Sequence, residues 1–323
     1  MAPASIIGKE IVQLCVVVED VERTASLYRE ILGFDIPSEY QTLEPYAHTL
    51  STYHGKPADF KAKFVAYSMG NVSFELLQPL SEGSVWMDYL KSHGPGIQHM
   101  TFNVPRSAAA WAAMNDHGYP MTQQGLFTGR RGMYSYVETE KDLGVTIEFL
   151  EYYDGEPQPQ PTPPFPANTG IGTNLICQIG FVVNDRDCAV ELYRSVLELP
   201  EPSLQQTPGY HITEMTFMGQ PSEATAKLAF FPAGQVQLEL IEPDETPSVW
   251  RNYLNDKGVS AHHIAFQVRD SQKAIDHFAK FGIGVAQQGL YSDRSGVYTY
   301  MNTEPQLGII IELLESFGAP RPR

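Results

Sequence analysis

The sequence has few of the residues that mark a secreted, disulfide-stabilised or membrane-inserted protein. It contains only three cysteines, Cys15, Cys177 and Cys188, with no CxxC pair and no framework spacing. This argues against a disulfide scaffold and favours buried, reduced thiols. No apolar stretch reaches membrane-spanning length, and the start lacks a basic region followed by a long apolar run. We therefore expect a cytoplasmic protein that does not insert into a membrane.

Positive charge is also scarce. There are 22 Lys and Arg against 38 Asp and Glu, a formal net charge of -16. Nucleic acids and anionic membranes require a concentrated basic face, so this balance argues against both, and it disfavours a heavily phosphorylated substrate. A chain of 323 residues is long enough for two domains with their own cores. We expect a small-molecule partner and a monomer or homodimer.

What the sequence does contain is an internal duplication. Residues 53–63 recur as residues 217–227, an offset of 164, and a slightly different offset of 165 applies near the start. The matched pairs are Gln13 with Gln178, Glu75 with Glu239, His99 with His263, Tyr136 with Tyr300, and Glu148 with Glu312. Self-similarity at this period indicates two copies of one structural unit.

A proline-rich segment separates the two copies. Residues 154–172 carry a dense run of prolines, which can neither continue a helix nor donate to a β-ladder, followed by a glycine-rich stretch. The sequence therefore predicts an N-terminal domain over 8–153, an extended linker over 154–172 and a C-terminal domain over 173–317.

Each copy is itself double. Residues 13–18 resemble 99–104, and 72–77 resemble 145–150, so the chain comprises four units. Each unit opens with a short apolar strand, continues with a helix and closes with a strand that carries one Glu. In the first unit, helical spacing begins after Asp20 and ends at Gly33. The order strand, helix and then about three strands predicts an α+β fold of four βαβββ units.

The four glutamates form a constellation with the residues that open the units. A single Glu on an apolar strand is more often on a solvated sheet face than in a metal site, and a lone His is more often structural. Here each Glu is paired with a Gln or His at the start of the first strand. The set is Gln13, Glu75, His99, Glu148, Gln178, Glu239, His263 and Glu312. Oxygen and nitrogen ligands of this kind suit a divalent metal.

These motifs resemble those of the vicinal-oxygen-chelate superfamily, which includes glyoxalase I, methylmalonyl-CoA epimerase, extradiol dioxygenases and bleomycin-resistance proteins. The resemblance implies two cup-shaped open barrels, each built from two units and holding one divalent ion of zinc, nickel, cobalt, manganese or iron. It also implies that the eight residues above are the ligands. The sequence leaves open whether units one and two share a cup, or units one and four.

Within the superfamily, Gln178 stands where extradiol dioxygenases have the first of two histidines, which disfavours a dioxygenase. The Gln-Glu-His-Glu set is similar to that of eukaryotic-type glyoxalase I and to that of the epimerase. Residues 75–79 and 262–266 look more like the epimerase. Bleomycin-resistance proteins bind ligands in an apolar groove and need no such set.

The resemblance implies chemistry in which a proton is removed beside a metal-chelated carbonyl. We assign Glu148 and Glu312 as bases, with Glu75 and Glu239 as the opposing partners. Glutathione carboxylates or CoA phosphates would require clustered cations, and only Arg130, Arg131 and Arg294 stand in predicted active-site loops.

We therefore predict an epimerase or isomerase of a neutral, sugar-like or cyclitol ketone of the valiolone type. The alternatives are a lactoylglutathione lyase and a non-catalytic binding protein of the bleomycin-resistance type.

Overall fold

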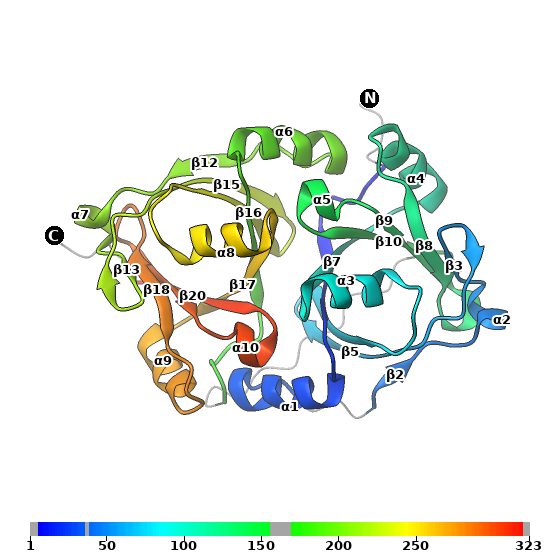
Figure 1. Cartoon of the computed structure of the whole chain (residues 1–323), viewed down its shortest axis with the longest axis horizontal. Coiled ribbons are helices and arrows are strands. Elements are labelled where there is room, and N and C mark those ends of the chain that lie inside the picture. Colours follow the sequence, from blue (N-terminus) through cyan, green and yellow to red (C-terminus); the bar gives the residue numbers. More distant parts are fainter. Residues whose placement is uncertain (1–5, 36–38, 156–168, 319–323) are drawn as a thin grey trace.

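The computed structural model describes residues 6–35, 39–155 and 169–318. Two ten-stranded sheets, each curled into an open half-barrel, lie side by side with helices around them (Figure 1). The predicted α+β fold with two cup-shaped barrels is confirmed. Of the predicted linker, residues 156–168 lie outside the described residues.

The N-terminal sheet is built from two units. The elements of the first are β1 (Ile11–Val17), α1 (Val21–Leu32), β2 (Gln41–Thr42), α2 (Tyr46–Thr49), β3 (Thr52–Tyr53), β4 (Lys56–Pro57), β5 (Ala62–Met69), β6 (Val72–Pro79) and α3 (Val85–His93). Those of the second are β7 (Gly96–Asn103), α4 (Ser107–Asp116), β8 (Met121–Leu126), a 3₁₀ turn (Thr128–Arg130), β9 (Gly132–Val137), α5 (Glu140–Leu143) and β10 (Thr146–Tyr152).

The C-terminal sheet repeats this order. The third unit comprises β11 (Ile176–Val182), α6 (Arg186–Leu197), β12 (Ser203–Gln206), α7 (Tyr210–Thr213), β13 (Thr216–Phe217), β14 (Gln220–Pro221), β15 (Ala226–Ala233), β16 (Val236–Pro243) and α8 (Val249–Lys257). The fourth comprises β17 (Ser260–Val268), α9 (Ser271–Ala279), β18 (Val285–Leu290), β19 (Gly296–Met301), α10 (Glu304–Leu307) and β20 (Ile310–Ser316).

The strand order determines which units share a cup. In the N-terminal sheet it is β2-β5-β6-β1-β7-β10-β9-β8-β3-β4, and the C-terminal sheet has the same order of counterparts. The opening strands β1 and β7 pair antiparallel at the centre, and each also pairs in parallel with the closing strand of its own unit, β6 or β10. Units one and two therefore form the first cup, and units three and four form the second.

Local sequence signals begin and end the first helix of each half. The Asp20 carboxylate accepts a hydrogen bond from the backbone N–H of Arg23 at 3.0 Å, and Gly33 ends α1 with a φ of 84°. Asp185 caps α6 through the N–H of Cys188 in the same way. These are the expected roles of an acidic N-cap and a left-handed glycine.

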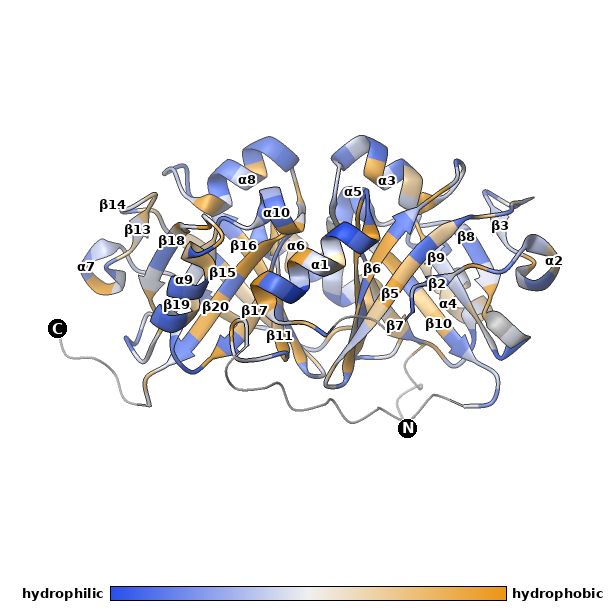
Figure 2. Ribbon diagram, turned by 90° about the horizontal axis from the view of Figure 1, so that it is seen from below, coloured by the Kyte–Doolittle hydropathy of each residue, from blue (hydrophilic) through white to orange (hydrophobic). Residues whose placement is uncertain are grey.

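The two halves are held together by one continuous apolar core and by matched polar contacts. The core contains buried residues of both sheets, and orange strands meet between the halves in Figure 2. The Tyr28 hydroxyl on α1 donates to the carbonyl of Leu307 on α10 at 3.0 Å. Its counterpart Tyr193 on α6 donates to the carbonyl of Leu143 on α5. Separate apolar clusters line the two cups.

Along the stretches that the structure describes, no helix combines the length and apolar character needed to cross a membrane.

Candidate metal centres

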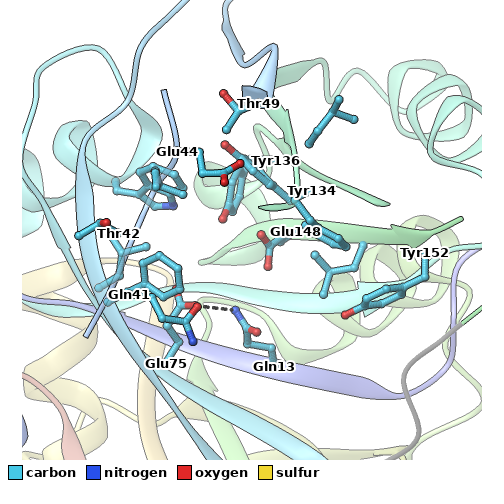
Figure 3. Close-up of a pocket in the computed structure, with 17 residues that line it drawn as sticks. Gln13, Gln41, Thr42, Glu44, Thr49, Glu75, Tyr134, Tyr136, Glu148 and Tyr152 are labelled. Atoms are coloured by element: carbon cyan, nitrogen blue, oxygen red, sulfur yellow. Dashed lines mark hydrogen bonds between the residues drawn. The ribbon is translucent and has the colours of Figure 1, made fainter. Parts of the chain in front are cut away.

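The first cup holds a cavity of about 340 Å³ whose lining includes three of the predicted site residues (Figure 3). Gln13, Glu75 and Glu148 point into it from β1, β6 and β10. Glu75 and Glu148 come from strands on either side of the central pair β1–β7. The Gln13 side-chain amide lies 3.4 Å from Glu75 Oε2, to which it donates a hydrogen bond.

His99, the fourth predicted residue of this cup, is fully buried on β7. Its Nδ1 lies 2.7 Å from Gln98 Oε1, and an amide oxygen only accepts, so Nδ1 carries a proton. Nε2 lies 3.4 Å from Glu148 Oε2, but it has no partner in hydrogen-bond geometry. Glu148 Oε2 instead accepts a hydrogen bond from the Thr101 hydroxyl at 2.7 Å.

The second cup, with a cavity of about 480 Å³, brings the carboxylates closer to the imidazole. His263 Nε2 lies 3.0 Å from Glu312 Oε2 and 3.5 Å from Glu239 Oε2. His263 Nδ1 is 2.9 Å from Nδ1 of His262. Gln178 also lines this cup, but its amide donates to Gln237 Oε1 at 3.1 Å. Two carboxylates thus flank one histidine nitrogen.

Burial and neighbouring charges separate the acidities of these carboxylates. Burial raises the pKa of Glu75 to about 7. The pKa of Glu239 also lies well above its ordinary value because of burial and repulsion by Glu312. Burial acts on Glu148 in the same direction, but the His99 ring and hydrogen bonds from Tyr136 and Thr101 outweigh it, so its pKa is lowered. Within the first cup, one carboxylate is thus set to be ionised at neutral pH while the other holds its proton more readily.

The polar atoms of both cups fit a divalent cation. Four buried atoms of the predicted ligands lack a hydrogen-bond partner: His99 Nε2, His263 Nε2, Glu239 Oε2 and Glu312 Oε2. Unsatisfied buried polar atoms are rare and call for an explanation. An imidazole nitrogen and carboxylate oxygens that converge in one pocket are donors that zinc and other divalent transition metals accept. The described residues contain two such clusters, one in each cup.

The cluster in the first cup includes a residue that the sequence did not single out. Donor atoms of Cys15, Glu75 and His99 lie within 4.8 Å of one another. The available signal was its spacing, because a residue two positions after Gln13 on a strand lies on the same face. His262 was expected on the opposite face in a structural role, yet it contacts His263 directly through its ring.

The three arginines of the predicted active-site loops have other partners, and Arg131 lies 3.7 Å from the Asp154 carboxylate. Arg130 donates to the carbonyls of Ala47 and His48, and Arg294 donates to Ile212 and Glu214. Both thereby fix the short helices α2 and α7 at the rim. None of the described residues that line either cup is Lys or Arg.

The chain is similar in sequence to one known superfamily and to one bacterial protein. Residues 12–137 and 177–300 match the Glyoxalase/Bleomycin resistance protein/Dioxygenase superfamily. A stretch of 114 residues is 41% identical to the uncharacterized protein YqjC of Bacillus subtilis (strain 168), covering 33% of this chain and 79% of that protein.

Among solved structures, a mutant 4-hydroxymandelate synthase from Streptomyces coelicolor is similar with a TM-score of 0.62 and 16% identity, covering 98% of this chain and 95% of that one. Methylmalonyl-CoA epimerase from Mycobacterium tuberculosis is similar with a TM-score of 0.35 and 19% identity, over 47% of this chain and 93% of that one. The first likeness shows a shared fold over the whole chain.

Proposed function

Because this chain belongs to the Glyoxalase/Bleomycin resistance protein/Dioxygenase superfamily, and each of its cups contains a histidine flanked by carboxylates, we propose that it is a metal-dependent epimerase or isomerase. It removes and returns a proton beside the carbonyl of a neutral, polyhydroxylated ketone of the sugar-like or cyclitol kind. The observation that carries the proposal is the arrangement of Glu239 and Glu312 at 3.5 and 3.0 Å from the same buried, unpartnered nitrogen of His263.

In each cup, some residues would bind the metal and others would transfer the proton. A divalent metal, when bound, supplies the Lewis acidity that polarises a substrate carbonyl. His99 with Glu75, and His263 with Glu239, would hold it together with Gln13 and Gln178, and Glu148 and Glu312 would be further ligands that detach during turnover. Glu148, whose pKa is lowered, is ionised at neutral pH and accepts the proton in the first cup.

Glu75 lies on the other side of the central strand pair from Glu148, so it is placed to return a proton from another direction. Glu312 and Glu239 take the corresponding roles in the second cup.

The lining of the cups supports a neutral substrate. Glu44 adds a carboxylate to the first cup, and Asp293 adds one to the second, while the lining residues include no Lys or Arg. Glutathione carboxylates and CoA phosphates would therefore meet negative charge without a compensating cation. Threonine, glutamine and tyrosine side chains in both cups offer neutral hydrogen bonds to hydroxyl groups.

The state of the cysteines bears on the cellular compartment of the protein. Its three thiols are free, which suits the reducing cytoplasm, but the expectation of burial was correct only for Cys15, because Cys177 is half-buried and Cys188 is exposed. We place it there as a monomer or homodimer that acts on a small molecule.

Solvent deuterium exchange tests the proposed chemistry. The metal-loaded protein in heavy water should wash deuterium into the carbon beside the carbonyl of a true substrate, found by comparing sugar-like ketones, cyclitol ketones, acyl-CoA esters and the glutathione hemithioacetal. Glu148→Gln and Glu312→Gln preserve size but remove the base, so each should reduce exchange at its own cup by roughly two to four orders of magnitude. The double variant should lose nearly all exchange while still binding metal.

Three other outcomes would redirect the assignment. Turnover of the hemithioacetal alone would make the protein a lactoylglutathione lyase. Tight binding of a panel member without exchange would make it a binding protein. Full activity of the double variant on a confirmed substrate would exclude Glu148 and Glu312 as bases, and Glu75 and Glu239 would be next to test.

A further inference from the structure

The two cups differ at the residue that faces both the carboxylate and the imidazole. On the central strand of the first cup, Cys15 pairs with Glu75 on one side and with His99 on the other. In the second cup the same position is Gly180, which pairs with Glu239 and His263. Residues directly opposite each other on neighbouring strands present their side chains on the same face. The Cys15 thiol therefore lies between two candidate ligands.

The geometry around Cys15 is that of a donor cluster. Its sulfur, a carboxylate oxygen of Glu75 and a ring nitrogen of His99 all lie within 4.8 Å of one another, and all three residues are buried. Bonds of about 2.0–2.3 Å to a common ion place neighbouring ligand atoms roughly 3.5 Å apart, so only small side-chain shifts are needed. Gln98 engages Nδ1 of His99, which leaves the unpartnered Nε2 for the cluster.

In the second cup the imidazole occupies the space that the thiol fills in the first. A Cβ atom placed on Gly180 would lie 1.9 Å from Cε1 of His263. The ring thus lies directly against the glycine, and from there its Nε2 is 3.5 Å from Glu239 and 3.0 Å from Glu312. The donors that converge here are one nitrogen and two carboxylates.

Glu148 and Glu312, the glutamates on the closing strands β10 and β20, differ in their hydrogen-bond partners. The Thr101 hydroxyl donates to Glu148 Oε2 at 2.7 Å. The counterpart of Thr101 is Ala265, which has no hydroxyl, and Glu312 Oε2 has no hydrogen-bond partner. The protein itself satisfies the carboxylate oxygen in the first cup, whereas the equivalent oxygen in the second cup is left for a ligand.

We infer that the first cup binds a transition metal through the sulfur of Cys15 together with Glu75 and His99, whereas the second cup uses only oxygen and nitrogen donors from Glu239, His263 and Glu312. Thiolate ligands favour zinc and cobalt over manganese and magnesium, so the cups of one chain differ in metal preference. The metal replaces the thiol proton, which leaves to solvent. The inference rests on the proposed function in requiring that the cups hold metal.

Cobalt provides a direct readout, because a cobalt–thiolate bond gives a near-ultraviolet charge-transfer band that oxygen and nitrogen ligands do not give. The full chain, stripped with a chelator and titrated with Co²⁺, should show this band. Cys15→Ser should abolish it and weaken zinc binding at the first cup by more than the roughly 10- to 100-fold typical of losing a ligand's hydrogen-bond partner. Cys177→Ser and Cys188→Ser, the matched controls, should retain the band.

A second variant separates loss of the ligand from loss of the fold. Cys15→Gly gives the first cup the residue of the second, so it should still bind cobalt, without the band, and keep the circular dichroism of the parent. If the parent binds cobalt without a charge-transfer band, or if the band survives Cys15→Ser, Cys15 is not a ligand. Either result would leave the proposed metal-dependent function standing. Failure of the first cup alone to bind metal would overturn the sulfur ligand, and failure of both cups would overturn the sulfur ligand and the metal-dependent function together.

Discussion

At the scale of single residues, each cup holds ionisable groups in an apolar setting. Glu75, Glu148, Glu239 and Glu312 are all less than a tenth exposed. A buried carboxylate is costly unless a hydrogen bond, a cation or a proton compensates it. Glu148 has hydrogen-bond partners, whereas burial makes Glu75 and Glu239 hold protons more tightly. Burial of these carboxylates therefore lowers the stability of the metal-free protein, and a bound cation would offset this loss.

This cost predicts how the stability of the metal-free protein depends on pH. Burial raises the pKa of Glu75 from 4.5 to about 7, so between these values the folded chain holds a proton that the unfolded chain has released. The free energy of unfolding therefore falls as pH rises through this window, by about 3 kcal/mol from this group, and the full loss is present above pH 7.

Glu75→Gln should remove this contribution: the chelated variant should match its parent near pH 4 and exceed it near pH 8 in urea unfolding. Glu30→Gln, at an exposed position on α1, is the control and should follow the parent at both pH values. Parallel stability curves for the parent and Glu75→Gln would show that the pKa of Glu75 is not raised.

At the scale of elements, the strands that bear the histidines begin at the interface between the halves. The backbone N–H of Ala261 at the start of β17 donates to the carbonyl of Gly144, which ends α5 in the other half. Gly144 has a φ of 70°, and a Cβ there would lie 2.7 Å from the Cα of Ser260. The close approach of α5 to β17 therefore requires glycine, and it fixes the strand on which His263 stands.

Two glycines with similar backbone conformations test this contact. Gly118 has a φ of 87° with nothing within 4 Å of an added Cβ, so Gly118→Ala should cost only the left-handed strain of about 1–2 kcal/mol. Gly144→Ala carries the same strain and also forces two backbones apart, so it should lower thermal stability clearly more and weaken metal binding at the second cup. Equal losses of stability for the two variants would mean that the halves do not depend on this approach.

At the scale of the whole molecule, the two halves share one architecture and differ at the centre of the sheet, where Cys15 in the first half corresponds to Gly180 in the second. The repeat, the alternation of the strands and the helix caps at Asp20 and Asp185 were enough to predict four units, and the resemblance to the superfamily predicted the two cups. The shared cup of units one and two was not predictable, because the pairing of β1 with β7 leaves no mark in either strand's own pattern. Of the eight candidate ligands, the two glutamines and the four glutamates line the cavities, and the two histidines are buried next to the closing-strand glutamates.

The sequence did not predict which side chains complete the cluster of donor atoms in each cup. Cys15 resembled an ordinary core thiol, because a small apolar residue in an apolar strand needs no other explanation. Its proximity to Glu75 and His99 depends on the register of three strands, and register is a property of the folded sheet. The partners of Arg130 and Arg294 were hidden for the same reason, since they lie about eighty residues away along the chain.

The metal content of the purified full-length chain tests the central claim most directly. Elemental analysis should find up to two divalent transition-metal ions per chain, one for each cluster of donors. His99→Ala and His263→Ala should each lose one ion, and the double variant should lose both while retaining its secondary structure. A parent protein that holds no transition metal, and takes up none when it is chelated and then reloaded, would contradict the account.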